Sequence, residues 1–262
     1  MKQRLEINGH SIYIQTHGPD SGNALLFLHH GLGAVRSWKE QIPVFARSGY
    51  RVVAYDRWGH GKSTPRERWS MPYFKEDLAD LQVILDTLEI PEAVLIGHSD
   101  GGKIAMYYTI SNPDRVNSLV IVSAHIYIEK KMDSGINSVK HDFEHDHRFQ
   151  TKMRRVHGDK SEALFWGWYN GWARKDILKW DMRPGINQIS CPTLVIQGVE
   201  DEHASPQHAR DIAANIPHSE LWLVPSADHM LPQEHGEQFN RRVLEFIEQS
   251  MPVQKTKARI ME

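Results

Sequence analysis

Two kinds of hydrophobic pattern alternate along this chain. Near the N-terminus, apolar and polar residues alternate on both sides of Asn8-Gly9, from Leu5 to Ile14. Alternation around a short Asn-Gly turn is typical of an antiparallel hairpin with one face on the core. Later runs are apolar throughout, which is typical of strands buried on both faces of a parallel sheet. These runs are 24–28, 50–55, 93–96, 119–122, 193–196 and 221–224.

Helical patterns lie between these apolar runs. Within 74–88, apolar side chains recur at three- and four-residue intervals and would share one helix face: Leu78, Leu81, Ile84, Leu85 and Leu88. Further helices are expected at 101–110, 207–214 and 237–247. Because strand and helix alternate, the pattern predicts an α/β domain whose mostly parallel, twisted sheet is flanked by helices.

One long segment does not follow this alternation. From about Ala124 to Ser190 there is no pattern of a buried strand, and the segment is rich in histidine, tryptophan and charge. Because a structureless loop of that length is uncommon in a compact domain, we interpret 124–190 as a helical cap. The core then consists of 1–123 and 191–250, and we expect 251–262 to be a flexible tail.

The composition restricts the class of protein and its partners. Hydrophobic residues make up 40% of the 262 residues, charged residues 24%, and the formal net charge is −2. So balanced a charge gives no reason to expect nucleic acid or an anionic membrane as a partner. No run approaches the roughly 18 apolar residues of a membrane span, and the first residues lack the apolar stretch of a signal peptide. With Cys191 as the only cysteine, we expect a reducing, cytoplasmic location. We expect the protein to be a monomer or a homodimer.

The motif Gly97-His98-Ser99-Asp100-Gly101 carries the clearest chemical signal. It lies between an apolar strand pattern and a helical one. A Gly-x-Ser-x-Gly motif in this setting is typical of a nucleophile elbow, where serine stands on a sharp turn from strand to helix. The alternative is an ordinary glycine-rich turn, but the flanking elements favour the elbow. Ser99 is therefore the candidate nucleophile.

A serine hydroxyl needs a base, and the base needs an acid that orients it. In this architecture the chain order is serine, acid, histidine. His229 follows the last predicted strand, and Asp201 follows the strand before it. We expect Glu200 and Glu202, on either side of Asp201, to face solvent. Asp228 is a weaker candidate because adjacent side chains in a loop usually diverge. The sequence thus predicts a triad of Ser99, Asp201 and His229.

The segment His29-His30-Gly31-Leu32-Gly33 directly follows a buried strand pattern. Backbone N–H groups in this loop and after the nucleophile stabilise the oxyanion of a tetrahedral intermediate in such sites. We assign this role to the N–H groups of Leu32 and Asp100. Metal binding by the paired histidines is the alternative, but neighbouring histidines point in different directions and no carboxylate cluster accompanies them. We expect no metal and no organic cofactor.

The side chain of Asp100 raises a question of charge. At ~6 Å and an effective dielectric constant of ~20, its carboxylate would repel the developing oxyanion by about 3 kcal/mol. We therefore expect it to point away or to be paired with Lys103, with Arg36 or with a cationic group of the substrate. The last option is the hypothesis that Asp100 favours esters carrying an amine.

Other candidate substrate-binding residues lie in and near the cap. The aromatic side chains of Trp166, Trp168, Tyr169 and Trp172 would either line an apolar pocket or form the core of the cap. His125 follows a strand end, where pocket residues often lie, and a structural role is equally compatible with its position. The sequence leaves these alternatives open.

Together the motifs resemble the α/β-hydrolase superfamily over about residues 5–250. The resemblance is carried by His30-Gly31-x-Gly33, Asp56-x-x-Gly59-x-Gly61-x-Ser63, the elbow, Gly198-x-x-Asp201 and His229. Asp228 departs from the glycine that usually precedes the catalytic histidine. The elbow with its second glycine is similar to that of biphenyl-hydrolase-like and valacyclovir-hydrolase-like esterases.

The resemblance implies a cofactor-independent serine hydrolase that cleaves a small carboxylic ester through an acyl-enzyme. Lactonase, C–C bond hydrolase, thioesterase and perhydrolase activities use the same triad and stay open, because the pocket decides among them. Ser99 argues against the dehalogenases and epoxide hydrolases of the superfamily, which have aspartate at the elbow. A ligand receptor with little turnover is the alternative from another class.

Overall fold

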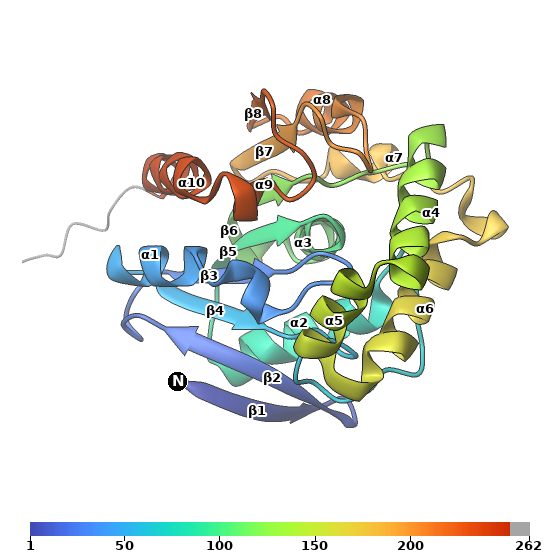
Figure 1. Ribbon diagram of the computed structural model, residues 1–262. Helices are drawn as coiled ribbons and strands as arrows, with labels where there is room; N and C mark the ends of the chain where they lie inside the picture. The colour runs from blue at the N-terminus through green and yellow to red at the C-terminus, as the bar shows by residue number, and fades with distance from the viewer. Residues whose placement is uncertain (252–262) are drawn as a thin grey trace, which may run out of the picture.

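A computed structural model describes residues 1–251 of the chain, and its centre is one eight-stranded sheet (Figure 1). The strand order across the sheet is β1-β2-β4-β3-β5-β6-β7-β8. Strand β2 pairs antiparallel with β1 and β4, and all other pairs are parallel. The strands are β1 (Lys2–Ile7), β2 (His10–His17), β3 (Ala24–Leu28), β4 (Arg51–Tyr55), β5 (Ala93–His98), β6 (Val116–Val122), β7 (Thr193–Gly198) and β8 (Ser219–Val224).

Two hydrophobic cores lie on the two faces of this sheet, because successive side chains of a strand point to opposite faces. Leu25 and Phe27 of β3 belong to the core beneath α1 (Gln41–Arg47) and α10 (Gly236–Ser250). Leu26 and Leu28 belong to the core on the other face. Helices α2 (Lys75–Thr87), α3 (Asp100–Ser111) and α8 (Pro206–Asn215) cover that second face. The sequence therefore predicted the layers correctly, although α1, with Pro43 inside it, was not expected.

Between β6 and β7 the chain forms helices, as the sequence predicts. They are α4 (Lys130–His145), α5 (His147–His157), α6 (Ser161–Trp172) and the short α7 (Arg183–Ile186). Figure 1 shows α4, α5 and α6 together on one side of the molecule, in green and yellow. Their shared core includes Met153, Leu164 and Phe165, and Phe143 stacks on Phe165 with ring centres 3.7 Å apart. We call the segment 124–190 the cap.

Short elements complete the fold. They are the 3₁₀ turns Val35–Trp38, Pro113–Arg115, Gly158–Lys160 and Lys175–Ile177, and the helix α9 (Leu231–Glu234). Within residues 1–251 no helix is both long and apolar enough to cross a membrane. The flexible tail predicted for 251–262 lies, apart from Met251, outside the described residues.

Candidate active site

Ser99 stands between the end of β5 and the start of α3, where the sequence places the elbow. Its backbone has φ 54° and ψ −114°, a conformation that costs a non-glycine residue about 1–3 kcal/mol. The surrounding structure holds this strain, since the Ser99 N–H donates to the carbonyl of Val122 at 2.8 Å. A Cβ atom at Gly97 would overlap the carbonyl oxygen of Gly101, and a Cβ atom at Gly101 would overlap that of Leu28. The two motif glycines are thus required by close backbone contacts.

His229 and Asp201 come from the loops after β8 and β7 and meet beside the elbow, where Nε2 of His98 lies 2.8 Å from the His229 carbonyl oxygen. Nδ1 of His229 lies 2.8 Å from Oδ2 of Asp201, and both side chains are buried. Asp201 also accepts hydrogen bonds from the side chain of Gln197 (2.7 Å) and from the N–H groups of His203 (2.8 Å) and Ala204 (3.0 Å). These contacts fix the carboxylate and leave Nε2 as the ring nitrogen of His229 available to another group.

His229 and Asp201 shift each other's pKa in the direction that favours the charged form of each. Burial lowers the pKa of His229, but the Asp201 carboxylate and its hydrogen bond outweigh burial and raise the pKa above its usual value. Burial likewise raises the pKa of Asp201, but His229 and the two backbone donors hold it well below its usual value. Asp201 therefore stays ionised at neutral pH, and the ring of His229 binds a proton more readily than an ordinary imidazole.

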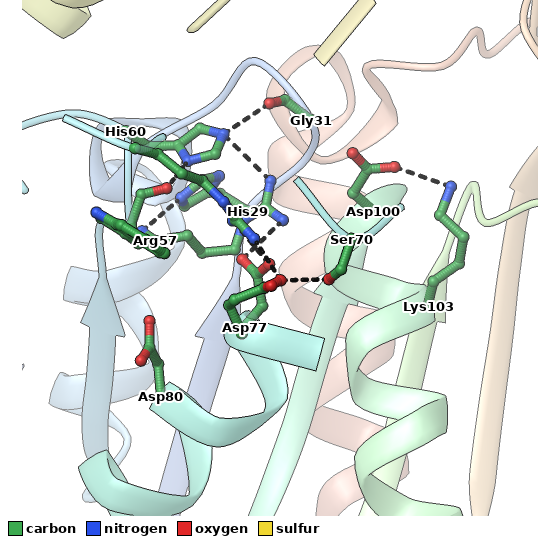
Figure 2. Close-up of polar contacts among 12 residues, drawn as sticks. His29, Gly31, Arg57, His60, Ser70, Asp77, Asp80, Asp100 and Lys103 are labelled. Carbon is green, nitrogen blue, oxygen red and sulfur yellow. Dashed lines mark hydrogen bonds and ion pairs between the residues drawn. The ribbon is translucent and has the colours of Figure 1, made fainter. Parts of the chain in front are cut away.

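The loop after β3 presents the predicted oxyanion donors. Within residues 1–251, no protein acceptor is found for the N–H of Leu32 or of Asp100. The Leu32 N–H and the Gly31 carbonyl belong to the same peptide group. Nε2 of His60 lies 2.8 Å from that carbonyl oxygen (Figure 2). Burial and the nearby Arg57 guanidinium lower the pKa of His60 well below its usual value. His60, whose Nε2 also lies 3.3 Å from the Arg57 guanidinium, thus contacts this peptide directly.

His157 of α5 fixes the same loop from the cap. Its Nε2 lies 3.1 Å from the Leu32 carbonyl oxygen, and its Nδ1 accepts the Gly61 N–H at 2.9 Å. Burial lowers the pKa of His157 to about 4. A neutral ring supplies one donor and one acceptor, which these two contacts require. Lys160 of the cap also donates to the carbonyl of Gly61.

Asp100 is paired inside the protein, and Lys103 is its partner. Oδ1 of Asp100 lies 2.9 Å from Nζ of Lys103, and both side chains are almost completely buried (Figure 2). Its second oxygen accepts from the indole of Trp168 at 3.2 Å. Both oxygens therefore have partners within the protein. Arg36, the other partner considered from the sequence, forms no ion pair within residues 1–251.

Lys103 in turn contacts groups that face the cavity. Its ammonium lies 3.0 Å from Nε2 of His125 and 4.2 Å from the centre of the Trp172 ring. Burial lowers the pKa of Lys103 to about 8, although Asp100 opposes the shift. Burial and Lys103 also lower the pKa of His125 well below its usual value.

A cavity of about 470 Å³ joins these groups. The predicted site residues that line it are Leu32, Ser99, Asp100, His125, Trp168, Trp172 and His229. Trp166 and Tyr169 do not line it, which corrects their inclusion among the candidate substrate-binding residues. They pack in the cap core, where both lie close to Phe165. The cavity is thus formed by loops of the sheet and by the inner faces of α4, α5 and α6.

Two residues near the triad were not singled out from the sequence. The ring of His203 packs edge-on against His229, with centres 4.6 Å apart, and lines the cavity. Lys131 of α4 donates to the backbone carbonyl of Asp201. The position of His203 two residues after the predicted acid is the only sequence signal for its role. Lys131 gives none, because its partner is distant in the chain.

No group of three or more histidine, cysteine, aspartate or glutamate side chains in residues 1–251 could hold a metal ion. The paired histidines of the oxyanion loop have other contacts. Nε2 of His29 accepts the Arg57 N–H at 3.1 Å, and Nε2 of His30 lies 3.3 Å from the hydroxyl of Ser37.

The model of one protein family, described as the alpha/beta hydrolase fold, matches residues 23–176. The chain belongs to the α/β-hydrolase family. The curated proteins that resemble it at low identity over most of its length include the following two. The mouse serine hydrolase BPHL is 24% identical, covering 94% of this chain and 86% of its own. The bifunctional esterase/perhydrolase DCH of Acinetobacter calcoaceticus is 26% identical, covering 92% and 97%.

A solved structure has the same overall arrangement as this α/β hydrolase. The enol-lactonase of Burkholderia xenovorans LB400 superposes with a TM-score of 0.77 at 20% identity, covering 94% of this chain and 99% of its own. The superposition concerns the fold alone. Membership of the family makes the chain a hydrolase, and its relatives differ in the bond they cleave.

Proposed function

We propose that this hydrolase cleaves small carboxylic esters through an acyl-enzyme on Ser99. The observation that carries the proposal is the buried contact of 2.8 Å between His229 and Asp201, made next to a cavity that Ser99 also lines. A buried carboxylate on one ring nitrogen sets the tautomer and leaves the other nitrogen to act as a base. The strained backbone of Ser99 is the second support. Residues in such conformations cluster at active sites, where the surrounding structure holds them in place.

In the proposed mechanism, Nε2 of His229 takes the proton of Ser99 as Oγ attacks the ester carbonyl carbon. The resulting oxyanion accepts hydrogen bonds from the N–H groups of Leu32 and Asp100. His229 then returns the proton to the departing alcohol, which leaves the acyl group on Ser99. Water activated by His229 attacks this acyl-enzyme and releases the acid. No step requires a cofactor.

Turnover of a short-chain p-nitrophenyl ester, with Ser99→Ala beside the wild type, tests the proposal. A fluorophosphonate label located by mass spectrometry identifies the nucleophile independently of the substrate. We expect repeated turnover and a label on Ser99, both lost in Ser99→Ala. A label on another residue, or full activity of Ser99→Ala, would refute the assignment. One slow turnover with retained product would instead favour a ligand receptor.

The same triad would also open a lactone, which is an internal ester, or cleave a C–C bond next to a carbonyl. The enol-lactonase with the same fold makes lactones a reasonable second class to assay. A panel of aryl esters, lactones and vinylogous diketones, ranked by kcat/KM, separates the three. The highest value among the aryl esters would support the proposal.

A further inference from the structure

The cavity beside Ser99 has an unequal distribution of charge. Four of its lining side chains are cationic: Arg36, Lys39, Lys152 and Arg155. We call these four the basic rim. Among the described residues that line the cavity the only acid is Asp100, which is buried and paired with Lys103. The formal net charge of the chain is −2, so a general excess of positive charge does not account for this concentration of cations.

The basic rim comes from two segments far apart in the sequence. Arg36 and Lys39 lie at the 3₁₀ turn that follows the oxyanion loop, whereas Lys152 and Arg155 lie on α5 of the cap. All four side chains are exposed. Within residues 1–251, Arg36, Lys152 and Arg155 form no ion pair, and Lys39 contacts only the exposed Glu40, at 3.2 Å. An exposed pair of that kind neutralises little charge.

A second cavity, of about 420 Å³, continues the positive region. It shares Arg36, Lys39 and Arg155 with the first cavity and adds Lys62. Its acid, Asp56, is buried, and the N–H groups of Val35 (2.6 Å) and Lys62 (2.7 Å) occupy its two oxygens. Both cavities therefore present cations without accessible carboxylates.

The inner part of the first cavity is different, because it is mainly apolar. Met132 and Val139 of α4 and Trp168 and Trp172 of α6 line it. A ligand that fits both parts has an apolar portion near Ser99 and a negative charge farther out. Arginine binds carboxylate and phosphate oxygens through paired donors, so the rim suits either anion.

We infer that the basic rim selects esters that carry an anionic group, carboxylate or phosphate, some distance from the reacting carbonyl. This inference rests on the proposed esterase function and names its substrate class. An exposed ion pair contributes a preference of about twofold to fivefold. With several cations acting together, the charged ester is preferred about tenfold or more over its neutral counterpart. Salt weakens the preference, because the screening length falls to about 3 Å at 1 M.

Two esters with the same number of acyl carbons test the inference on the acyl side. They are 4-nitrophenyl glutarate, which bears one carboxylate, and 4-nitrophenyl pentanoate, which is neutral. The ratio of their kcat/KM values is measured in the wild type, in Arg36→Gln and in Arg155→Gln. Arg154→Gln is the matched control, since Arg154 is the exposed neighbour on α5 that lines neither cavity.

The change in this ratio between proteins decides the test, because intrinsic reactivities cancel. We expect each rim variant to lower the ratio about threefold, the double variant to lower it further, and Arg154→Gln to leave it unchanged. In each rim variant the neutral ester should lose less activity than the glutarate ester, and Arg154→Gln should leave both rates unchanged. Rim variants whose ratios match the wild type would overturn the inference.

The leaving-group side distinguishes the two anions. Hydrolysis of 4-acetoxybenzoate and of 4-acetoxyphenyl phosphate is compared with that of phenyl acetate in the same variants. A response to the variants with the phosphate alone assigns the rim to phosphate, and a response with the benzoate alone assigns it to carboxylate. Responses with both make it a general anion site.

A binding measurement keeps the inference testable if the esterase proposal fails. The 4-nitroanilides of glutaric and pentanoic acid absorb where tryptophan emits, and Trp168 and Trp172 line the cavity. Quenching of fluorescence therefore reports binding without turnover. If Ser99 is neither labelled nor needed, tighter binding of the glutaryl compound, weakened in Arg155→Gln, still supports the rim. Equal binding of the two anilides overturns the inference and leaves the esterase proposal standing.

Discussion

Asp201 and Asp100 are two buried carboxylates in the same candidate active site, and their surroundings differ. Asp201 contacts an imidazole whose other nitrogen is free and whose pKa is raised above its usual value. Asp100 contacts an ammonium that is buried with it, together with one indole N–H. The first partner keeps a ring nitrogen that can take up a proton, whereas the second compensates the charge of Asp100. In the proposed mechanism, the partner of each buried acid, more than the carboxylate itself, determines whether that acid takes part.

The largest expected effect is that of Asp201→Asn. Loss of the carboxylate permits the wrong tautomer of His229, and we expect kcat to fall about 10⁴-fold. Steady-state hydrolysis of a neutral p-nitrophenyl ester measures it. Glu200→Gln, a neighbouring exposed acid, serves as the control and should retain wild-type rates. A loss smaller than about tenfold in Asp201→Asn would show that another acid orients His229.

Lys103→Met tests the second carboxylate through stability. Removing one partner of a buried ion pair leaves an uncompensated charge, which costs about 3–5 kcal/mol. We expect a loss of this size in the free energy of unfolding, measured with urea. Adding Asp100→Asn should restore most of it, because the unpaired carboxylate is then gone. Lys175→Met, at an exposed position, should change stability by no more than about 0.5 kcal/mol.

The pH dependence of kcat/KM separates the two pairs further. His229 must be neutral to accept the Ser99 proton, and Asp201 raises its pKa. Activity should therefore rise with pH, and the midpoint of this rise should lie above 6.5, the usual value. In Asp201→Asn the residual activity should have its midpoint at lower pH, since the largest influence that raises the pKa of His229 is then gone. An identical midpoint in both proteins would assign the titration to another group.

The smallest effect is expected for Asp100→Asn and concerns specificity. Both carboxylate oxygens already have partners in the protein. The ratio of kcat/KM for an amino-acid ester to that for a neutral ester should therefore be the same in the variant and the wild type. A general loss of activity caused by disturbing the Asp100–Lys103 pair affects both esters equally and cancels in this ratio. A selective loss with the amino-acid ester would show that Asp100 turns toward the substrate.

Much of the fold was predictable because buried parallel strands leave a direct record in the sequence. The apolar runs correspond to strands β3 to β8, and Gly9 marks the hairpin turn. Burial on both faces was wrong for β8, which lies at the edge of the sheet and leaves Leu221 39% exposed. Helix α1 was missed because it has seven residues, with Pro43 among them, so its apolar stripe is too short to recognise. In the cap, helix content was predictable, but the positions of the turns at Asp146 and Gly158 were not.

In the candidate site, too, local features were predictable and contacts between distant segments were not. The motifs around Ser99, Asp201 and His229 are local, so sequence alone predicts their roles. The aromatic residues of α6 were not separated, although spacing holds a clue: Trp168 and Trp172 are four residues apart and share a helix face. The basic rim has no local signal, because Arg36 and Arg155 meet only once the cap is folded.

The two contacts of His157 matter for the design of chimeras in this family. The ring of His157 joins α5 to the Leu32 carbonyl and to the Gly61 amide, so the cap helix supports the loop that carries the proposed oxyanion donor. A chimera that exchanges the cap for that of a relative therefore also removes the two contacts that His157 makes with loops of the core. The unit that can be transplanted includes the histidine together with the two loops it joins, and its borders do not coincide with the ends of the insertion.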